Sequence, residues 1–286
     1  MSFKKDLNRR KFLKLIAGGT AYSLISPISL LADNSAAEPS NPDENIKDYI
    51  SKIKNFDKPH PTDVILTPQM FNVLKSSYAK LRRVQRTVGY GNFNLISFDE
   101  VIKIARNYRR VGPFTKEELH FMEMVFYEKS SKYGFGGEKV LKNITDKVKR
   151  KETIKVPYSG HFLYRGDSLI LYNKLRKDVG TNLILTSGIR SIIKQFILFL
   201  GKAKKHKGNL SLASRSLAPP GYSFHGIGDF DVGLKGYGGL NFTSKFTKTT
   251  VYKKIKTLDY ISLRYTNNNL IGVRFEPWHI KVNKKA

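Results

Sequence analysis

Apolar residues recur at helical spacing from about residue 66 to residue 150. Thr67 can cap a helix that starts at Pro68, and its apolar positions over residues 71–81 then share one face. The runs S-F-D-E at 97–100 and T-K-E-E at 115–118 have the form of capping boxes, and each precedes an apolar pattern of helical period. The second of these helices is expected to stop near Gly134. The pattern therefore predicts a mainly helical region.

After about residue 155, short apolar runs alternate with helical patterns. Helices are expected over residues 169–179, 191–205 and 247–258, the first capped by Asp167 and ended by Gly180. Strands are expected at 182–186, 229–232, 260–265 and 271–282. A turn-forming run, T-N-N-N at 266–269, joins the last two strands, and residues 210–221 read as a Ser/Pro loop. The order lacks a regular βαβ rhythm, so we predict an α+β fold: a small antiparallel sheet with flanking helices, preceded by the helical region.

The N-terminus has the features of an export signal. Residues 8–14 read N-R-R-K-F-L-K, which resembles the twin-arginine signal, and a weakly apolar run over 15–31 suits its hydrophobic region. Small residues follow at Ala32 and at 35–37, so cleavage is expected near one of them. The alternative is a basic amphipathic N-terminal helix. No later stretch of about 20 uncharged apolar residues occurs, so no permanent membrane span is predicted.

Composition narrows the partners. The 286 residues include 51 Lys and Arg against 23 Asp and Glu, a net charge of +28, and 40% are hydrophobic, which is enough for a core. Such a charge indicates a polyanionic partner: nucleic acid, anionic lipid or a cell-wall polymer. Export by the twin-arginine machinery to the periplasm or another extracytoplasmic site favours the wall and argues against nucleic acid. The absence of cysteine excludes disulfides and thiolate metal sites, so any metal must be held by His, Asp or Glu.

Two of the six histidines lie in segments rich in residues typical of catalytic sites. His225 lies in G-Y-S-F-H-G-I-G-D-F-D-V-G at 221–233, and His279 lies in F-E-P-W-H-I at 275–280. A catalytic zinc needs three protein ligands and one open position. Asp229 and Asp231 are two apart and share a face of a strand, so either can complete a site with the two histidines. Glu276, three before His279, can lie beside the metal, where a general base is needed.

The other histidines have simpler interpretations. His161 either lines the cleft or is an ordinary core or surface residue. The remaining three are assigned to the surface or to a satisfied core: His60, His120 and His206.

Four elements in order resemble one family. They are S-x-H-x-x-G followed by Asp, E-P-W-H, S-G-I-R-S at 187–191 with Gln195, and L-R-Y at 263–265 with Gly272. Together they resemble the zinc D-alanyl-D-alanine carboxypeptidase and dipeptidase family of the vancomycin-resistance type. The resemblance spans residues 187–282 and does not extend to 40–155.

The resemblance implies roles for individual residues. It makes His225, His279 and an aspartate the Zn²⁺ ligands and Glu276 the catalytic base. Arg190 would bind the substrate's carbonyl or carboxylate and stabilise the oxyanion, although a structural ion pair is its alternative role. The remaining residues counted as substrate-binding are Ser223, Gln195 and Trp278.

The sequence departs from the family at two points. The usual spacing from the first His to the Asp is seven, whereas Asp231 lies six and Asp229 four after His225. Asp231 is preferred because D-V-G matches the family's ending of that strand, and Asp229 stays the alternative. Ile189 stands where the family has Tyr, which removes a polar group.

These observations predict three segments: a signal peptide (1–37), a linker and helical region of unknown role (38–150) and a catalytic domain (151–286). The predicted function is that of a zinc metallopeptidase, a D-alanyl-D-alanine carboxypeptidase that trims peptidoglycan stem peptides in the cell envelope. A peptidoglycan D,D-endopeptidase, L,D-carboxypeptidase or D,D-dipeptidase remains open within the same chemistry. Outside it, the alternative is a non-catalytic wall- or polyanion-binding protein on the same fold.

Overall fold

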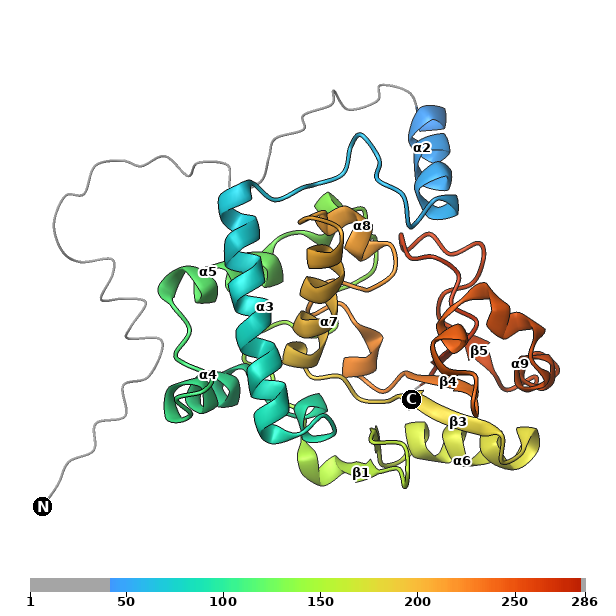
Figure 1. Cartoon of the computed structure of the whole chain (residues 1–286). Helices are drawn as coiled ribbons and strands as arrows, with labels where there is room; N and C mark the ends of the chain where they lie inside the picture. Colours follow the sequence, from blue (N-terminus) through green and yellow to red (C-terminus); the bar gives the residue numbers. More distant parts are fainter. Residues whose placement is uncertain (1–41, 284–286) are drawn as a thin grey trace, which may run out of the picture. The chain divides into compact units, whose positions relative to one another are not determined.

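A computed structural model describes residues 42–283, and side chains from residue 47 (Figure 1). Its fold is α+β, as predicted. The longer helices are α2 (Pro42–Lys54), α3 (Pro68–Val88), α4 (Phe98–Asn107), α5 (Lys116–Tyr127), α6 (Asp167–Val179) and α7 (Ile192–Lys205), and the short ones are α8 (Leu210–Ser214) and α9 (Thr250–Ile255). The strands are β1 (Thr153–Lys155), β2 (Phe162–Tyr164), β3 (Leu183–Ser187), β4 (Phe230–Leu234), β5 (Ser262–Leu263) and β6 (His279–Lys281).

Six 3₁₀ turns connect these elements in the described part of the chain. They are η1 (Asn92–Asn94), η2 (Ser130–Tyr133), η3 (Arg150–Glu152), η4 (Phe224–Gly226), η5 (Gly238–Phe242) and η6 (Ser244–Lys248).

The helical region begins its helices where the capping residues predict. The Thr67 side chain accepts a hydrogen bond from the Met70 amide with Pro68 in the first turn, and both predicted capping boxes form, before α4 and before α5. The end of α5 is different, because this helix stops at Tyr127 and not near Gly134. Gly134, in the left-handed conformation, ends η2 instead.

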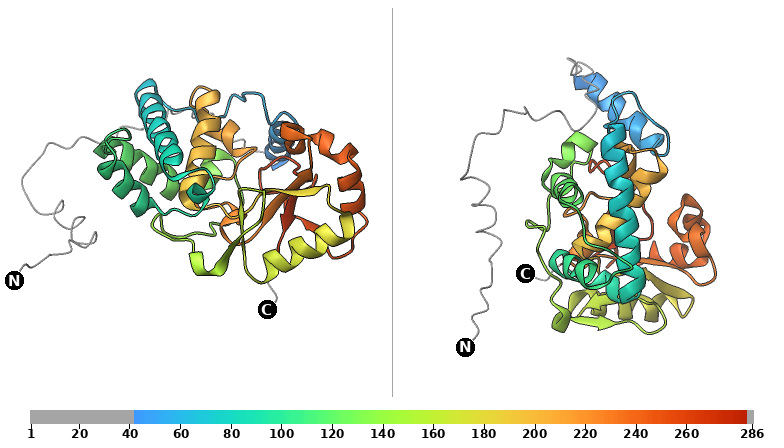
Figure 2. Two further views of the ribbon diagram at one scale, coloured as in Figure 1. Left: turned by 60° about the horizontal axis from the view of Figure 1, so that its bottom comes forward. Right: turned by 60° about the vertical axis from the view of Figure 1, so that its left-hand side comes forward.

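Helix α7 joins the two halves of the chain. Ser191 caps it, as its predicted start requires, and its apolar face packs against α3. One buried cluster includes Leu74 and Leu81 of α3, Phe121 of α5, and Phe196 and Leu200 of α7. Figure 2 shows α3 and α7 side by side. The helical region therefore shares its core with the helix that follows the first strand of the four-stranded sheet.

That sheet has the order β3-β4-β6-β5, and all its pairs are antiparallel. Its register places Ser187 opposite Asp231 and Asp231 opposite His279, with an irregularity between Leu185 and Ser187. Directly opposed residues project to the same face about 4.5–5.5 Å apart. The register thus brings together side chains that are distant in sequence. A second buried cluster joins this sheet to α6 and α9.

Several local predictions need correction. Residues 210–221 are not wholly loop, because Asn209 caps the short helix α8. Gly166 occupies the cap position of α6, where Asp167 is instead the first helical residue. The helix predicted at 247–258 is confined to α9, since Thr249 caps it and η6 precedes it.

The last two predicted strands are much shorter than expected. Only β5 and β6 form within 260–265 and 271–282. Long-range backbone bonds hold the segment between them, from the Arg274 amide to the Arg215 carbonyl and from the Glu276 amide to the Tyr265 carbonyl. These bonds divert the chain from a regular hairpin ladder.

Within residues 42–283, no helix has the length and apolar character needed to cross a membrane. The predicted twin-arginine motif at 8–14 and the predicted signal peptide at 1–37 lie outside the described residues.

Candidate metal centre

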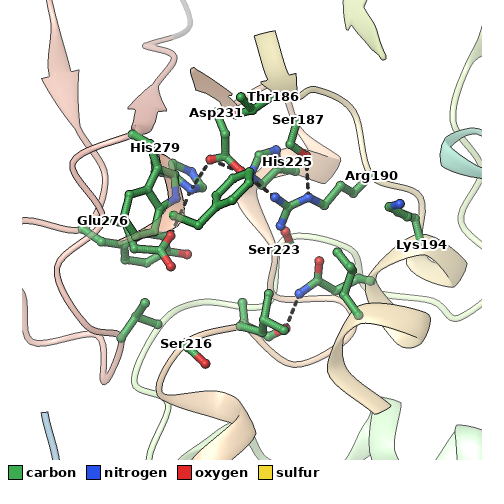
Figure 3. A pocket seen from close by; sticks show the side chains of 18 of the residues that line it. Thr186, Ser187, Arg190, Lys194, Ser216, Ser223, His225, Asp231, Glu276 and His279 are labelled. Carbon is green, nitrogen blue, oxygen red and sulfur yellow. Dashed lines mark hydrogen bonds and ion pairs between the residues drawn. The ribbon is translucent and has the colours of Figure 1, made fainter. Parts of the chain in front are cut away.

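A cavity of about 360 Å³ opens where α7 faces the four-stranded sheet. All the predicted site residues except the alternative ligand Asp229 line it: Arg190, Gln195, Ser223, His225, Asp231, Glu276, Trp278 and His279. Figure 3 shows His279 and Glu276 close to Asp231 and His225, with Arg190 next to Asp231. The structure therefore gathers these side chains, contributed by segments more than 80 residues apart, around one space.

His225, Asp231 and His279 converge in this cavity. Each offers one ligand atom, and the three atoms lie within 4.8 Å of one another. Asp231 Oδ1 is 3.3 Å from His225 Nε2 and 3.3 Å from His279 Nδ1. All three residues are buried. Two imidazoles and one carboxylate are a donor set that suits a divalent transition metal.

Hydrogen bonds on the outer nitrogens fix how each ring faces Asp231. His225 Nδ1 lies 2.8 Å from the Gly188 carbonyl, so it carries the proton and Nε2 has the free lone pair. His279 Nε2 lies 3.1 Å from Asp229 Oδ2, which leaves Nδ1 as the inner atom. Partners of this kind orient metal-binding histidines and raise their basicity.

The two candidate aspartates occupy different places. Asp229 lies behind His279, and its oxygens accept hydrogen bonds from Arg264 Nε at 2.7 Å, Arg264 Nη2 at 3.0 Å and the Val282 amide at 2.9 Å. Asp231 instead belongs to the convergent group. The geometry thus favours Asp231 as the third ligand and gives Asp229 the part of an outer support for His279.

Two inner atoms lack a hydrogen-bond partner within the described part of the chain. They are His225 Nε2 and Asp231 Oδ1, and both are buried. A buried polar atom without a partner is costly. A cation between them would satisfy both, so the residues present fit a bound metal.

The electrostatics of His225 and Asp231 support the same fit, whereas those of His279 favour its protonated form. Burial, reinforced by the charge of Arg190, lowers the pKa of His225 to about 4, so the ring is neutral and able to ligate. Burial raises the pKa of the Asp231 carboxyl, but its interactions with His225 and Arg190 outweigh burial and hold the pKa below its usual range. Burial also lowers the pKa of His279, yet Asp229 and Glu276 outweigh it and raise the pKa to about 9. Protonation of His279 and metal binding at Nδ1 therefore compete.

Glu276 and Arg190 flank the convergent group. Glu276 Oε2 is 3.6 Å from His279 Nδ1, close to the inner atoms without belonging to the triad. Arg190 donates from Nε to Ser187 Oγ at 2.9 Å and from Nη2 to Asp231 Oδ2 at 2.6 Å. Arg190 therefore forms the structural ion pair considered for it, with Asp231. Its guanidinium also lines the cavity, where a substrate would contact it.

The three predicted substrate-binding residues line the cavity in different ways. Ser223 is buried at the start of the turn that carries His225. Gln195 donates from Nε2 to the Ala218 carbonyl, whereas its Oε1 has no partner among the described residues. Trp278 is almost fully buried and packs edge-on against Phe242, which makes it largely structural.

The other histidines divide between the cavity and the surface. His161 lines the cavity, and burial together with Lys194 and Arg190 lowers its pKa to about 4. His60 Nε2 lies 2.9 Å from Asp48 Oδ1, His120 is exposed, and His206 is half-buried.

Several cavity residues carry no motif that the sequence analysis used. Lys194, Lys202 and Leu198 of α7 are spaced four residues apart and share one face. In the sequence, the one pattern that could have indicated this side of the cavity is the presence of lysines on a partly apolar helix face. Ser216, Tyr265 and Arg274 also line the cavity, and no spacing pattern points to them.

Part of the chain is similar to a known protein family. Residues 169–283 match the family model VanY, D-alanyl-D-alanine carboxypeptidase. This VanY-like region contains the convergent triad, Glu276 and Arg190, but not the helical region or His161. Among curated proteins, none matches the chain.

Solved structures give more distant similarities. The LdcB LD-carboxypeptidase is 22% identical over 45% of this chain and 63% of its own, with a TM-score of 0.37, so this chain matches less than two thirds of it. A VanY D,D-pentapeptidase variant from a VanB-type resistance cassette, in complex with Zn(II), is 23% identical over 46% and 78%, with a TM-score of 0.38. VanYB in complex with D-alanine-D-alanine is 23% identical over 46% and 76%, with a TM-score of 0.38.

Proposed function

We propose that this protein is a zinc-dependent D-alanyl-D-alanine carboxypeptidase that removes the terminal residue from peptidoglycan stem peptides. The main support is the buried triad of the VanY-like region, which has two inner atoms without hydrogen-bond partners and a carboxylate, Glu276, beside them. The triad offers three protein ligands, the number typical of catalytic zinc sites.

In this proposal His225 Nε2, Asp231 and His279 Nδ1 hold Zn²⁺. When bound, the ion supplies Lewis acidity that polarises the scissile carbonyl and acidifies water. The outer contacts from Gly188 and Asp229 keep both rings in the required tautomer and orientation.

Glu276 is the proposed general base. Its carboxylate lies beside the inner nitrogen of His279, accepts the proton of the attacking water, and returns it to the amine of the leaving D-alanine. The residue is only 8% exposed, so few bulk waters compete for its oxygens.

Arg190 is the proposed oxyanion donor. Its contacts with Ser187 and Asp231 use Nε and Nη2 and fix the guanidinium plane at the edge of the cavity. A well-placed donor of this kind typically contributes about 3–4 kcal/mol to transition-state stabilisation. In this proposal Ser223 and Oε1 of Gln195, which both belong to cavity-lining residues, contact the peptide.

The proposed site of action is the cell envelope after twin-arginine export. The net charge of +28 supports residence on an anionic wall, with association that weakens as salt rises.

The test is metal content and product release measured on one preparation. The purified protein should release D-alanine from a pentapeptide that ends in D-Ala-D-Ala, lose this activity with a chelator and regain it with zinc. Parallel peptides that end in L-Lys-D-Ala, and free D-Ala-D-Ala, distinguish the D,D-carboxypeptidase from an L,D-carboxypeptidase and a D,D-dipeptidase. Zinc-loaded protein that hydrolyses none of these substrates but is retained on wall sacculi would replace this proposal with the non-catalytic wall binder.

A further inference from the structure

The wall of the cavity that faces the metal centre carries an ammonium group that the proposed mechanism does not use. Lys194 lies in the first turn of α7 and lines the cavity together with Arg190 (Figure 3). It is half-buried, and no hydrogen bond or ion pair of its ammonium group joins it to the described residues. Its charge therefore has no partner within residues 47–283.

The surroundings make this charge unfavourable in three ways. Burial, then the charges of Arg190 and of Arg82 on α3, lower the pKa of Lys194 to about 8. The Lys194 amide donates to Ser191 Oγ, the cap of α7, so the ammonium also stands at the positive end of the helix dipole. A half-buried cation among cations is costly unless a ligand supplies the missing negative charge.

The neighbouring cations are already engaged. Arg190 is bonded to Ser187 and Asp231, and Arg82 donates to Gln85 Oε1. Lys202, which also lines the cavity, has the carboxylate of Asp57 in its electrostatic surroundings. Three lysine and arginine residues of α7 and its cap loop line the described cavity: Arg190, Lys194 and Lys202. Among these three, only Lys194 has neither an acidic neighbour nor a bonded partner.

We propose that Lys194 forms a carboxylate-binding subsite, so that the peptide substrate is held on the α7 wall by one of its carboxylates. This inference rests on the proposed peptidase function and specifies which chemical group of the substrate is recognised. The carboxylate is either an internal acidic group of the peptide or its terminal carboxylate, because both have the same chemistry. Arg82 belongs to α3, outside the VanY-like region, so the helical region tunes this subsite through its charge.

The kinetic test uses two peptides that end in D-Ala-D-Ala and differ only at one internal glutamate residue. One has a free carboxylate and the other a carboxamide. With an internal carboxylate as the ligand, the wild-type protein should have a kcat/KM about tenfold higher for the acidic peptide, the order expected of a charge-assisted hydrogen bond at a half-buried site. Lys194→Gln should reduce that ratio to near one, whereas Lys205→Gln, an exposed lysine on the same helix, should leave it unchanged.

A binding arm separates the two sources of carboxylate and does not depend on turnover. Affinity is measured by calorimetry on the Glu276→Gln background, which should bind the peptide without cleaving it, for the pentapeptide, for its internal amide and for its terminal amide. Loss of affinity on amidation at one position, abolished by adding Lys194→Gln, identifies that carboxylate as the ligand. Equal affinities for all three peptides, or unchanged discrimination after Lys194→Gln is added, would overturn the subsite.

Folding and function controls keep these outcomes distinct. Lys194→Arg keeps the charge and should retain the discrimination, and circular dichroism should show that both variants fold. Selective binding of the acidic pentapeptide in the binding arm, together with wild-type protein that never releases D-alanine, would refute the proposed function while supporting the subsite. Protein that releases D-alanine equally from both kinetic peptides and binds all three ligands equally would support the proposed function and refute the subsite.

Discussion

The two sides of the cavity hold their charged groups in opposite ways. On the metal side, each inner atom belongs to a group that a second contact restrains: Gly188 restrains His225, Asp229 restrains His279, and Arg190 restrains Asp231. On the α7 side, Lys194 has no such contact in the described structure. Rigid placement suits chemistry, which requires fixed ligand geometry. An unrestrained charge suits recognition, because the substrate then supplies the partner.

The largest expected effect is on the metal side. Asp231→Ala removes the carboxylate that lies 3.3 Å from both histidine rings, so we expect zinc content near zero and no measurable D-alanine release. Zinc is measured by atomic absorption after dialysis. The exposed Asp178→Ala variant is the matched control and should keep its metal. An Asp231→Ala protein that retains zinc would show that the triad is not the binding site.

Glu276→Gln should separate catalysis from metal binding. The amide cannot accept the water's proton, so kcat should fall about 10²–10⁴-fold, the usual contribution of a general base. Zinc content should stay at the wild-type level because Glu276 is not one of the three convergent ligands. Unchanged turnover would remove Glu276 from the role of base.

Asp229→Asn should have a smaller effect: it should lower the affinity for zinc but leave the number of zinc ions bound unchanged. The amide weakens the support of His279 Nε2 and disturbs the pair with Arg264. Loss of such an outer partner typically lowers metal affinity about 10–100-fold. Competition with a chelator of known affinity measures it. If Asp229→Asn removes zinc as completely as Asp231→Ala, the outer role assigned to Asp229 is wrong.

The same comparison explains what the sequence could and could not predict. Local capping signals identify the starts of α3, α4 and α5, because each depends on residues within one turn. The choice between Asp229 and Asp231 is different. Alternation expects both on one face of the predicted strand, and the D-V-G ending favours Asp231. In the structure Asp229 precedes β4 and bonds Arg264, whereas Asp231 lies opposite His279 of β6.

The surroundings of the cavity lysine Lys194 depend on tertiary structure. The pattern around Lys194 predicts an amphipathic helix correctly, and a lysine on such a helix normally reaches solvent. It lines a cavity here because α7 faces the sheet that carries Asp231 and His279, and because α3 brings Arg82 near it. Such proximity depends on packing between elements remote in sequence, which a single sequence does not encode in any local pattern.

The smallest expected effect is the pH dependence of selectivity. Burial and the nearby cations lower the pKa of Lys194 to about 8, so the ammonium loses its proton as pH rises through that value. The acidic-to-amide ratio of kcat/KM, which reports the free enzyme, should therefore decline above about pH 8. Lys194→Arg should keep the ratio to higher pH, because a guanidinium stays protonated. Profiles over pH 6.5–9.5 for both peptides measure this (a range of about 1.5 units either side of that pKa). A wild-type ratio that stays flat through this range while Lys194→Gln lowers it would mean that the lysine binds the peptide through a neutral contact.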